Sequence, residues 1–550
     1  MTVDESWSEI TGGPLANTTS LFSHLERGLR KSPHKPAVLC MHQSSNHLSE
    51  FIPVDDDFEQ QMNGVPHTYM TLTYTQLHRA AILLAAGMTA NGVNPGSTIL
   101  TLIPNGSEYS VVLWTCPILR LTISSLDPSI LDNTDLAELR RLMKILQPRI
   151  VVVPNAAGAR AVNKTVEDLG LAQPLGIVLG EDSEYHMSYG WKSLLALAVD
   201  ALSCSLDEEA LINNARNDDP QRTHSIFFTS GTSAGEPKGC PQRTSSITHV
   251  LHSQSWLMNP QGHNATQLIL VQPHNSRAVA PAVTLQAWRE GATVVMMNEG
   301  SFGIQITLDA IIKHGVDFII LTPAMVHALA LVSSGPLKLD SVSAVHLGGD
   351  AVTRDVLIKC SELFPTARVF LNHGMAEGGG FFEWPFFNMP ITQIPCFGEI
   401  CPIGKVAPGT RLRIWDADKN SRTRRGKPGE LHVCCQSIIQ HYLGNASASS
   451  FYDDEEGRWF NTGDIGMIDG NGLVFILGRA KDMIKRAGIA IMPSVLESCI
   501  EKYTGTQVRN GCLHPILSPE GYGLLISDVF QGLSSSYPSP NARPRAFCGT

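Results

Sequence analysis

Short apolar runs alternate with helical stretches along most of this chain. Apolar residues recur at helical spacing over Tyr74–Gly92, Asp132–Leu146 and Thr307–Lys313. Between and around these stretches, strand-like runs bounded by chain-breaking residues lie at Thr98–Ile103, Ile150–Val153, Gln267–Val271, Thr293–Met297, Phe318–Leu321 and Ala344–Leu347. Strands that alternate with helices predict an α/β fold with layered, mostly parallel sheets. In such folds ligands bind at the carboxyl ends of the strands.

The pattern changes after Lys405, where Gly-, Arg- and Val-containing strands follow one another through tight turns. This change predicts a small β-rich subdomain over about 400–478, within one large N-terminal domain over 1–480. Residues 481–550 are expected to form a short, truncated α+β C-terminal domain, whose Ser- and Pro-rich tail near Ser534–Pro540 is typical of disorder. We expect residues 1–20 to be a polar lead-in and Ser44–Pro66 to be a surface loop.

Composition limits the classes of function. The net charge of −10 disfavours general binding to nucleic acid or anionic lipid, which both attract basic proteins. The 12 cysteines form no CxxC pair, so reduced thiols are expected rather than a zinc site or a disulfide framework. Phe318–Val332 is too short to span a bilayer. The acidic N-terminus does not resemble a signal peptide, and Phe547–Thr550 is not a peroxisomal signal, so a cytoplasmic location is expected.

The clearest chemical signal is the segment Ile226–Gly239, in which an apolar strand leads into hydroxyls and glycines and then a lysine. Glycines let backbone N–H groups face an anion, hydroxyls add donors, and the lysine adds charge. The spacing differs from a Walker A loop because Glu236 and Pro237 precede Lys238. A polar surface turn is the alternative. The candidate phosphate-binding residues are Thr229, Ser230, Gly231, Thr232, Ser233, Gly235 and Lys238.

Three further segments follow in order: Leu347–Ala351 with a Gly-Gly pair, Leu371–Glu377, and Trp459–Asp464 followed by Gly478–Gly488. Together with the first segment they resemble the signatures of the acyl-adenylate-forming (AMP-binding) superfamily. The resemblance covers roughly Leu72 to Ile526 and is closest to acyl-CoA synthetases and coumarate-CoA-ligase-like enzymes. It implies a multi-subdomain adenylation domain that binds ATP and Mg²⁺, with coenzyme A as the second substrate.

The resemblance also implies roles for single residues. Gly348, Gly349 and Asp350 would lie against the adenine, Glu377 would bind Mg²⁺ and act in catalysis, and Asp464 would accept hydrogen bonds from the ribose hydroxyls. Arg479 would approach the ribose or a phosphate, and Lys238 would neutralise phosphate charge. The remaining nucleotide-binding candidates are Asn372, His373, which replaces the usual tyrosine, Gly374, Met375 and Ala376, which replaces the usual threonine.

Outside the nucleotide segments, Lys481 matches the family's pivot for the C-terminal domain and Gly488 matches a glycine beside the pantetheine thiol. His274 falls near a histidine that borders the acyl pocket, although a structural role is the alternative reading. Asn275-Ser276 stands near the place where amino-acid-selecting relatives carry an aspartate, which favours a plain carboxylic acid as substrate.

The chain departs from the family pattern at its end, because no lysine follows Lys502 and the family's C-terminal lysine motif is therefore missing. Lys485 is a candidate for supplying that charge. Loss of one donor at a centre of developing charge costs about 10²–10³ in rate. Three hypotheses follow: an acyl-CoA ligase, within the family's range a secondary-metabolic one; an adenylation domain that loads a carrier-protein thiol; or a catalytically impaired nucleotide-binding protein.

Overall fold

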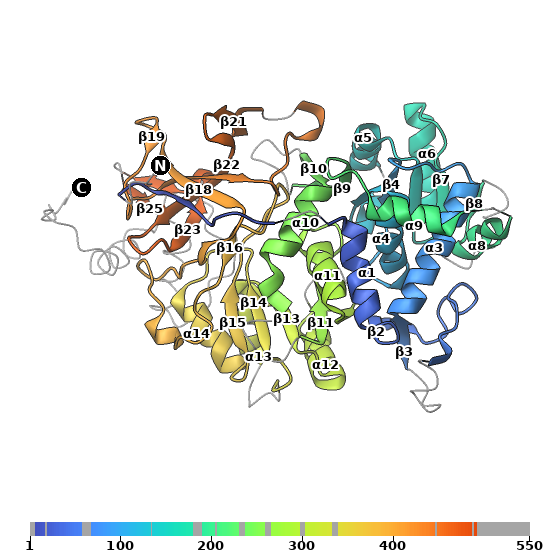
Figure 1. Ribbon diagram of the computed structural model, residues 1–550, viewed down its shortest axis with the longest axis horizontal. Helices are drawn as coiled ribbons and strands as arrows, with labels where there is room; N and C mark the ends of the chain where they lie inside the picture. Colours follow the sequence, from blue (N-terminus) through green and yellow to red (C-terminus); the bar gives the residue numbers. More distant parts are fainter. Residues whose placement is uncertain are drawn as a thin grey trace, which may run out of the picture.

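The computed structural model of the protein describes residues 6–16, 19–57, 68–133, 135–179, 190–203, 206–229, 237–258, 266–297, 303–332, 339–445, 448–486 and 489–491. It contains three seven-stranded sheets. Two of them are mostly parallel and are separated and flanked by helices, while the third is antiparallel and lies at one end of the molecule (Figure 1). The predicted α/β class is confirmed; the division into domains at residue 480 stays a prediction.

The first sheet is parallel except for its antiparallel edge strand β10. The run Ile150–Val153 predicted a strand, and all four of its residues are buried, as expected for a parallel strand covered on both faces. In spatial order the strands are β10 (Gly239–Arg243), β9 (Thr223–Phe228), β5 (Thr122–Ser125), β4 (Thr98–Thr101), β6 (Ile150–Val153), β7 (Leu175–Val178) and β8 (Trp191–Lys192).

The second sheet is parallel except where β2 pairs with the edge strand β3. It contains four of the strands predicted from apolar runs. In spatial order the strands are β15 (Arg368–Leu371), β14 (Ala344–Leu347), β13 (Phe318–Leu321), β11 (Leu268–Val271), β12 (Thr293–Met296), β2 (Pro36–Ser44) and β3 (Tyr69–Thr73).

Helices form the layers between and outside these two sheets (Figure 1). Helix α3 begins at Tyr74 because Thr73 and Gln76 form a capping box, and all residues of α4 are buried, which explains its lack of a polar face. The helices are α1 (Leu21–Lys31), α3 (Tyr74–Ala90), α4 (Ser107–Leu119), α5 (Ala137–Leu146), α6 (Ala156–Leu169), α8 (Leu194–Leu202), α9 (Glu208–Arg216), α10 (Thr244–Ser253), α11 (Val279–Glu290), α12 (Ile304–His314), α13 (Pro323–Val332) and α14 (Arg354–Leu363).

Aromatic side chains bind the helices between the sheets to one another. Trp114 of α4 lies 5.3 Å from Trp288 of α11 and 6.0 Å from Tyr74 of α3, measured between ring centroids. The Trp288 indole N–H donates to the carbonyl of Ala37 in β2 at 3.0 Å, and the Tyr74 hydroxyl donates to the carbonyl of Ala292 at 2.6 Å. The polar tips of Trp288 and Tyr74 therefore have partners while their rings fill the core.

The third sheet contains most of the region predicted to be β-rich, and its pairs are antiparallel. One strand was not expected: β1 lies within the segment 1–20, for which we expected only a polar lead-in, and it pairs with β18. The strands are β1 (Glu9–Thr11), β18 (Thr410–Asp416), β20 (Gly429–Cys435), β22 (Gly457–Ile468) and β21 (Phe451–Asp454), with β19 (Ser421–Arg422) on β18 and β23 (Val474–Arg479) on β22.

Two small ladders complete the described chain: β16 (Phe382–Glu383) with β17 (Lys405–Val406), and β24 (Ile484–Arg486) with β25 (Ile489–Ile491).

The expected loop Ser44–Pro66 is described only as far as residue 57, where Phe51 and Asp55 are buried rather than exposed. Among the described helices, none has the length and apolar character needed to cross a bilayer. Beyond residue 491, the expected C-terminal domain and its tail lie outside the described residues.

Buried histidines predict that the protein loses stability in mild acid. Burial lowers the pKa of His24 and His224 to about 3 and that of His249, His346 and His432 to about 4. In the unfolded chain these groups would titrate near 6.5. Below about pH 6.5 the unfolded chain binds protons at these histidines, whereas the folded protein does not. The free energy of unfolding therefore falls from its full value above about pH 6.5 toward pH 4, by up to about 1.4 kcal/mol per pH unit per histidine.

Denaturant unfolding at pH 7.5, 6.0 and 5.0 measures this loss. The variant His224→Gln removes one buried titrating group and should show a shallower dependence of unfolding free energy on pH, whereas the exposed His441→Gln should leave the slope unchanged. Equal slopes in all three proteins would contradict the assignment.

Candidate nucleotide-binding site

Three neighbouring strands of the second sheet end level with one another. The residues Leu321, Leu347 and Leu371 are Cα partners across β13, β14 and β15. The pairing continues one step beyond the strands, because the Gly348 N–H donates to the carbonyl of Leu321 at 3.1 Å and the Asn372 N–H donates to that of Leu347 at 3.0 Å. Two of the segments predicted to bind the nucleotide therefore leave the same edge of the sheet side by side.

The Gly-Gly pair is required by close packing at this edge. A Cβ at residue 348 would lie 2.8 Å from the carbonyl oxygen of Asn372. Gly349 has φ +91°, and a Cβ there would lie 3.1 Å from Cγ2 of Thr322, which follows β13. Side chains are therefore excluded, and the backbone of the pair can face a flat ring. Asp350 follows the pair and is exposed.

The segment after β15 is held from both sides by amide groups. The Asn372 side-chain N–H donates to Oε1 of the buried Gln254 at 2.7 Å, and its Oδ1 accepts from the His373 N–H at 2.9 Å. Met375 and Gly378 exchange backbone hydrogen bonds of 2.9 and 3.2 Å across a tight turn. The carbonyl of Ala376 accepts from Nε2 of Gln242 in β10 at 2.7 Å, so this segment also contacts the first sheet.

Asp464 joins the antiparallel sheet to this segment. The residue is 3% exposed, and its Oδ1 lies 3.2 Å from Nε of Arg479 while Oδ2 lies 3.4 Å from Nε2 of His373. The Asp464 N–H donates to Oγ1 of Thr462 at 3.0 Å. Within the described part of the chain Oδ2 has no hydrogen-bond donor, so this buried oxygen is suited to accept a hydroxyl of a ligand.

The predicted Mg²⁺ ligand Glu377 lies beside a tyrosine that sequence reasoning did not select. The hydroxyl of Tyr442 donates to Oε1 of Glu377 at 2.7 Å, and Nζ of Lys238 lies 4.9 Å from the centre of the Tyr442 ring. Burial, with the nearby Glu377 charge, raises the pKa of Tyr442, which keeps the phenol protonated as a donor. Glu377 and Lys238 are thus gathered around one ring, and a carboxylate oxygen beside a cation suits a metal–phosphate site.

The two ends of the predicted phosphate loop are joined by two hydrogen bonds. The Thr229 N–H donates to the carbonyl of Lys238, and the Lys238 N–H donates to Oγ1 of Thr229, both at 3.0 Å. Ser230, Gly231, Thr232, Ser233 and Gly235 lie outside the described residues, as does Gly488. Lys481 is exposed in the 3-10 turn Ala480–Asp482 that follows β23, and Lys485 lies in β24.

His274 is placed at the contact between the two parallel sheets. The ring is 3% exposed, with Nδ1 2.9 Å from the hydroxyl of Ser276 and Nε2 3.2 Å from the carbonyl of Ile103, which follows β4. Burial lowers its pKa and favours the neutral ring. Both nitrogens are therefore engaged in structural contacts, and the role at an acyl pocket stays a prediction.

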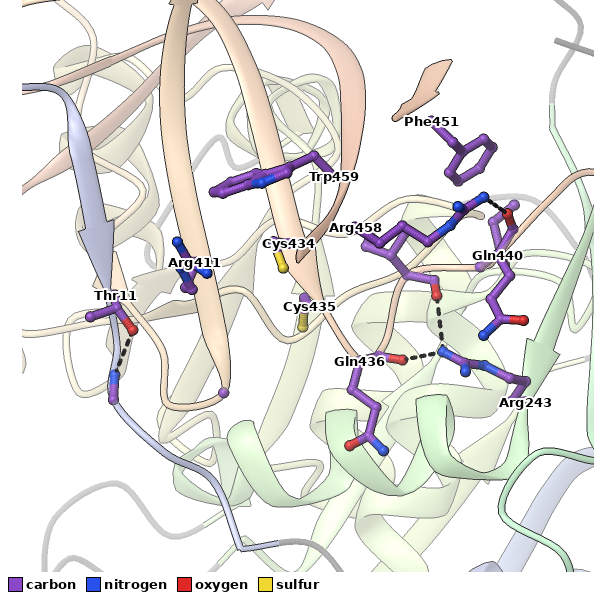
Figure 2. A pocket seen from close by; sticks show the side chains of 14 residues that line it. Thr11, Arg243, Arg411, Cys434, Cys435, Gln436, Gln440, Phe451, Arg458 and Trp459 are labelled. Atoms are coloured by element: carbon purple, nitrogen blue, oxygen red, sulfur yellow. Dashed lines mark hydrogen bonds between the residues drawn. The ribbon is translucent and has the colours of Figure 1, made fainter. Parts of the chain in front are cut away.

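A separate pocket of about 350 Å³ is lined by residues of β18, β20, β21 and β22 and by Gln436–Gln440, the segment that precedes Tyr442 (Figure 2). Its lining includes Arg243, Arg411 and Arg458 and contains no acidic residue. Figure 2 shows Arg243 directed at the carbonyl of Gln436 and Arg458 directed at that of Gln440, at 3.0 and 2.8 Å. These guanidinium groups fix the segment that precedes Tyr442. The same segment supports Glu377 directly, because the Ile439 N–H donates to the Glu377 carbonyl at 2.9 Å.

Comparison with known proteins identifies the family of this chain. The family described as AMP-binding enzyme matches residues 30–443. An acyl-CoA ligase of Pestalotiopsis microspora is 43% identical over 521 residues, covering 94% of this chain and 88% of that protein. The 4-coumarate-CoA ligase 1 of Arabidopsis thaliana is 25% identical, covering 79% and 74%. The ATP-bound crystal structure of MatB from Rhodopseudomonas palustris has the same fold, with a TM-score of 0.67 at 18% identity and coverage of 88% and 83%.

The family match spans most of the chain, and it includes the strand ends, the glycine pair and the Glu377 segment of the candidate site. The resemblance inferred from the sequence is therefore confirmed: this chain belongs to the family of AMP-binding enzymes.

Proposed function

We propose that this protein activates a carboxylic acid with ATP and transfers the acyl group to coenzyme A. The observation that carries the proposal is the meeting of Gly348–Gly349, His373 and Asp464 at one edge of the second sheet, in a chain 43% identical to an acyl-CoA ligase. In the first step a carboxylate oxygen attacks the α-phosphorus of ATP and pyrophosphate leaves. In the second step the thiol of coenzyme A attacks the acyl carbon and AMP leaves.

The chain's own residues would supply positioning and charge. The glycine pair would contact adenine, Asp464 would accept from the ribose, and Lys238 would stabilise phosphate charge. Glu377 would hold a Mg²⁺ ion, whose role when bound is to neutralise charge on the phosphates. The Tyr442 hydroxyl would orient Glu377 by donating to one of its oxygens.

Acid-dependent exchange of pyrophosphate into ATP tests the first step, because it requires a reversible acyl-adenylate. We expect exchange to appear with a subset of a carboxylic-acid panel and to be absent without acid. Adding free coenzyme A should then yield a thioester. Exchange without any thioester would instead favour loading of a carrier-protein thiol, and ATP binding without exchange would favour an impaired nucleotide-binding protein.

Asp464→Ala should raise the apparent KM for ATP at least tenfold, because hydrogen bonds to a charged acceptor contribute roughly 1.5–3 kcal/mol. The effect is measured by pyrophosphate exchange over a range of ATP concentrations. Asp453→Ala is the matched control, since Asp453 is an exposed carboxylate of the same sheet. An unchanged KM in Asp464→Ala would reduce Asp464 to a structural partner of Arg479.

Glu377→Gln should lower the exchange rate by about 10² and raise the Mg²⁺ concentration needed for half-maximal rate, because a neutral amide is a weaker ligand for a hard cation. Tyr442→Phe keeps the ring near Lys238 but removes the 2.7 Å hydrogen bond, so a smaller shift in the same direction is expected. Mg²⁺ titrations of both variants check this order. A Mg²⁺ dependence identical to that of the parent in Glu377→Gln would place the metal elsewhere.

A further inference from the structure

Two thiols face each other across a tight hairpin in the segment between β16 and β17. The Sγ atoms of Cys396 and Cys401 are 3.6 Å apart. Between them Phe397 and Ile400 exchange both backbone hydrogen bonds, at 2.9 and 3.1 Å, and Gly398 turns the chain with φ +58°. Cys396 and Cys401 are thus the adjacent non-hydrogen-bonded pair, in which Cα atoms approach to about 4.5 Å.

This geometry fits a disulfide without movement of the backbone, since bridged cysteines have Cα separations of about 4.4–6.8 Å. The other adjacent thiols of the described chain do not share it. Cys434 and Cys435 are neighbours in β20, where successive side chains point to opposite faces. The Cys435 thiol is engaged with His249 and Ser437, both at 3.1 Å.

The two thiols also differ in the way that oxidation chemistry requires. Cys396 is partly exposed, whereas Cys401 is buried. The hydrogen bond from Cys401, supported by the nearby Arg354 guanidinium, lowers the pKa of Cys396. The same contact, together with burial, raises the pKa of Cys401. Cys396 is therefore the thiol that is more accessible to solvent-borne oxidants and more readily deprotonated, and the buried Cys401 would act as the resolving thiol.

We propose that Cys396 and Cys401 form a reversible disulfide when the protein meets a peroxide. The Cys396 sulfur attacks one oxygen of hydrogen peroxide, and the O–O bond breaks. The other oxygen departs as water with the thiol proton, and Cys396 becomes a sulfenic acid. The Cys401 sulfur then attacks the Cys396 sulfur, the S–S bond forms, and a second water carries away the hydroxyl and the thiol proton. The two sulfurs together lose two electrons, and the peroxide gains them.

The hairpin contacts two of the candidate nucleotide-binding segments, so a disulfide there would affect the backbone that supports them. The Cys401 N–H donates to the carbonyl of Val352, three residues after Gly349, at 2.9 Å, and the Arg354 N–H donates to the carbonyl of Glu399 at 2.8 Å. Phe397 lies 6.3 Å from Phe475 of β23, the strand that ends at Arg479. Closing the hairpin covalently would stiffen the support behind Gly349 and beside Arg479.

Peptide mapping tests the proposal directly. The reduced full chain is exposed to hydrogen peroxide, alkylated with iodoacetamide and digested with trypsin. No Lys or Arg lies between Arg368 and Lys405, so both cysteines fall in one peptide, and Cys434 and Cys435 likewise share the peptide Gly426–Arg458. We expect the first peptide to lose two hydrogens and escape alkylation, the second to be alkylated twice, and dithiothreitol to restore alkylation of the first.

Two variants separate the steps. Cys401→Ser should leave Cys396 as a sulfenic acid that dimedone traps, whereas Cys396→Ser should leave Cys401 unoxidised and alkylated. Hydrogen exchange adds a local readout: the amides of Phe397 and Ile400 should exchange about tenfold more slowly in the oxidised parent than in the reduced parent. Double alkylation of the 396–401 peptide after peroxide, or bridging at Cys434–Cys435 instead, would overturn the proposal. Neither outcome depends on the ligase activity.

Discussion

The level ends of β13, β14 and β15 are the constraint on which the candidate site depends. Hydrogen-bonding register fixes Leu321, Leu347 and Leu371 side by side, so the three following loops must begin at one edge within a few ångströms of each other. Core packing fixes the apolar strands in place, and the strands in turn fix the positions of the glycine pair, Thr322 and Asn372.

The antiparallel sheet contributes a buried carboxylate, that of Asp464, to this edge of the parallel sheet. Asp464 stands in the long strand β22 beside Arg479 of β23, and it meets His373 of the parallel sheet's loop. Burying a carboxylate is costly unless charged or donor groups surround it. Arg479 and His373 lower that cost, while one carboxylate oxygen keeps its capacity to accept. The packing of the two sheets thereby creates a buried polar site around Asp464 that neither sheet forms alone.

The sequence reveals those parts of this structure whose cause is local. Four-residue strands such as Ile150–Val153 are buried on both faces and appear as continuous apolar runs, and the Thr73–Gln76 box marks the start of α3. The edge strand Glu9–Thr11 was missed because it has three residues and only one is buried. The Tyr442–Glu377 bond was missed because it joins residues 65 apart, and a lone tyrosine has no local pattern. His373 was expected to bind the nucleotide, but its contact with Asp464 could not be predicted from the sequence because it depends on the packing of two sheets.

The pairing of β1 with β18 also shapes how the chain can be made. Glu9 pairs with Arg413, so 413 − 9 = 404 residues separate the partners. At a synthesis rate of about 5–20 residues per second, the first strand leaves the ribosome roughly 20–80 s before its partner exists. The parallel sheets can assemble in that interval, because their last strand, β15, precedes β18. The antiparallel sheet is therefore completed last, and the ribosome-bound chain exposes an unpaired N-terminal segment until translation passes residue 416.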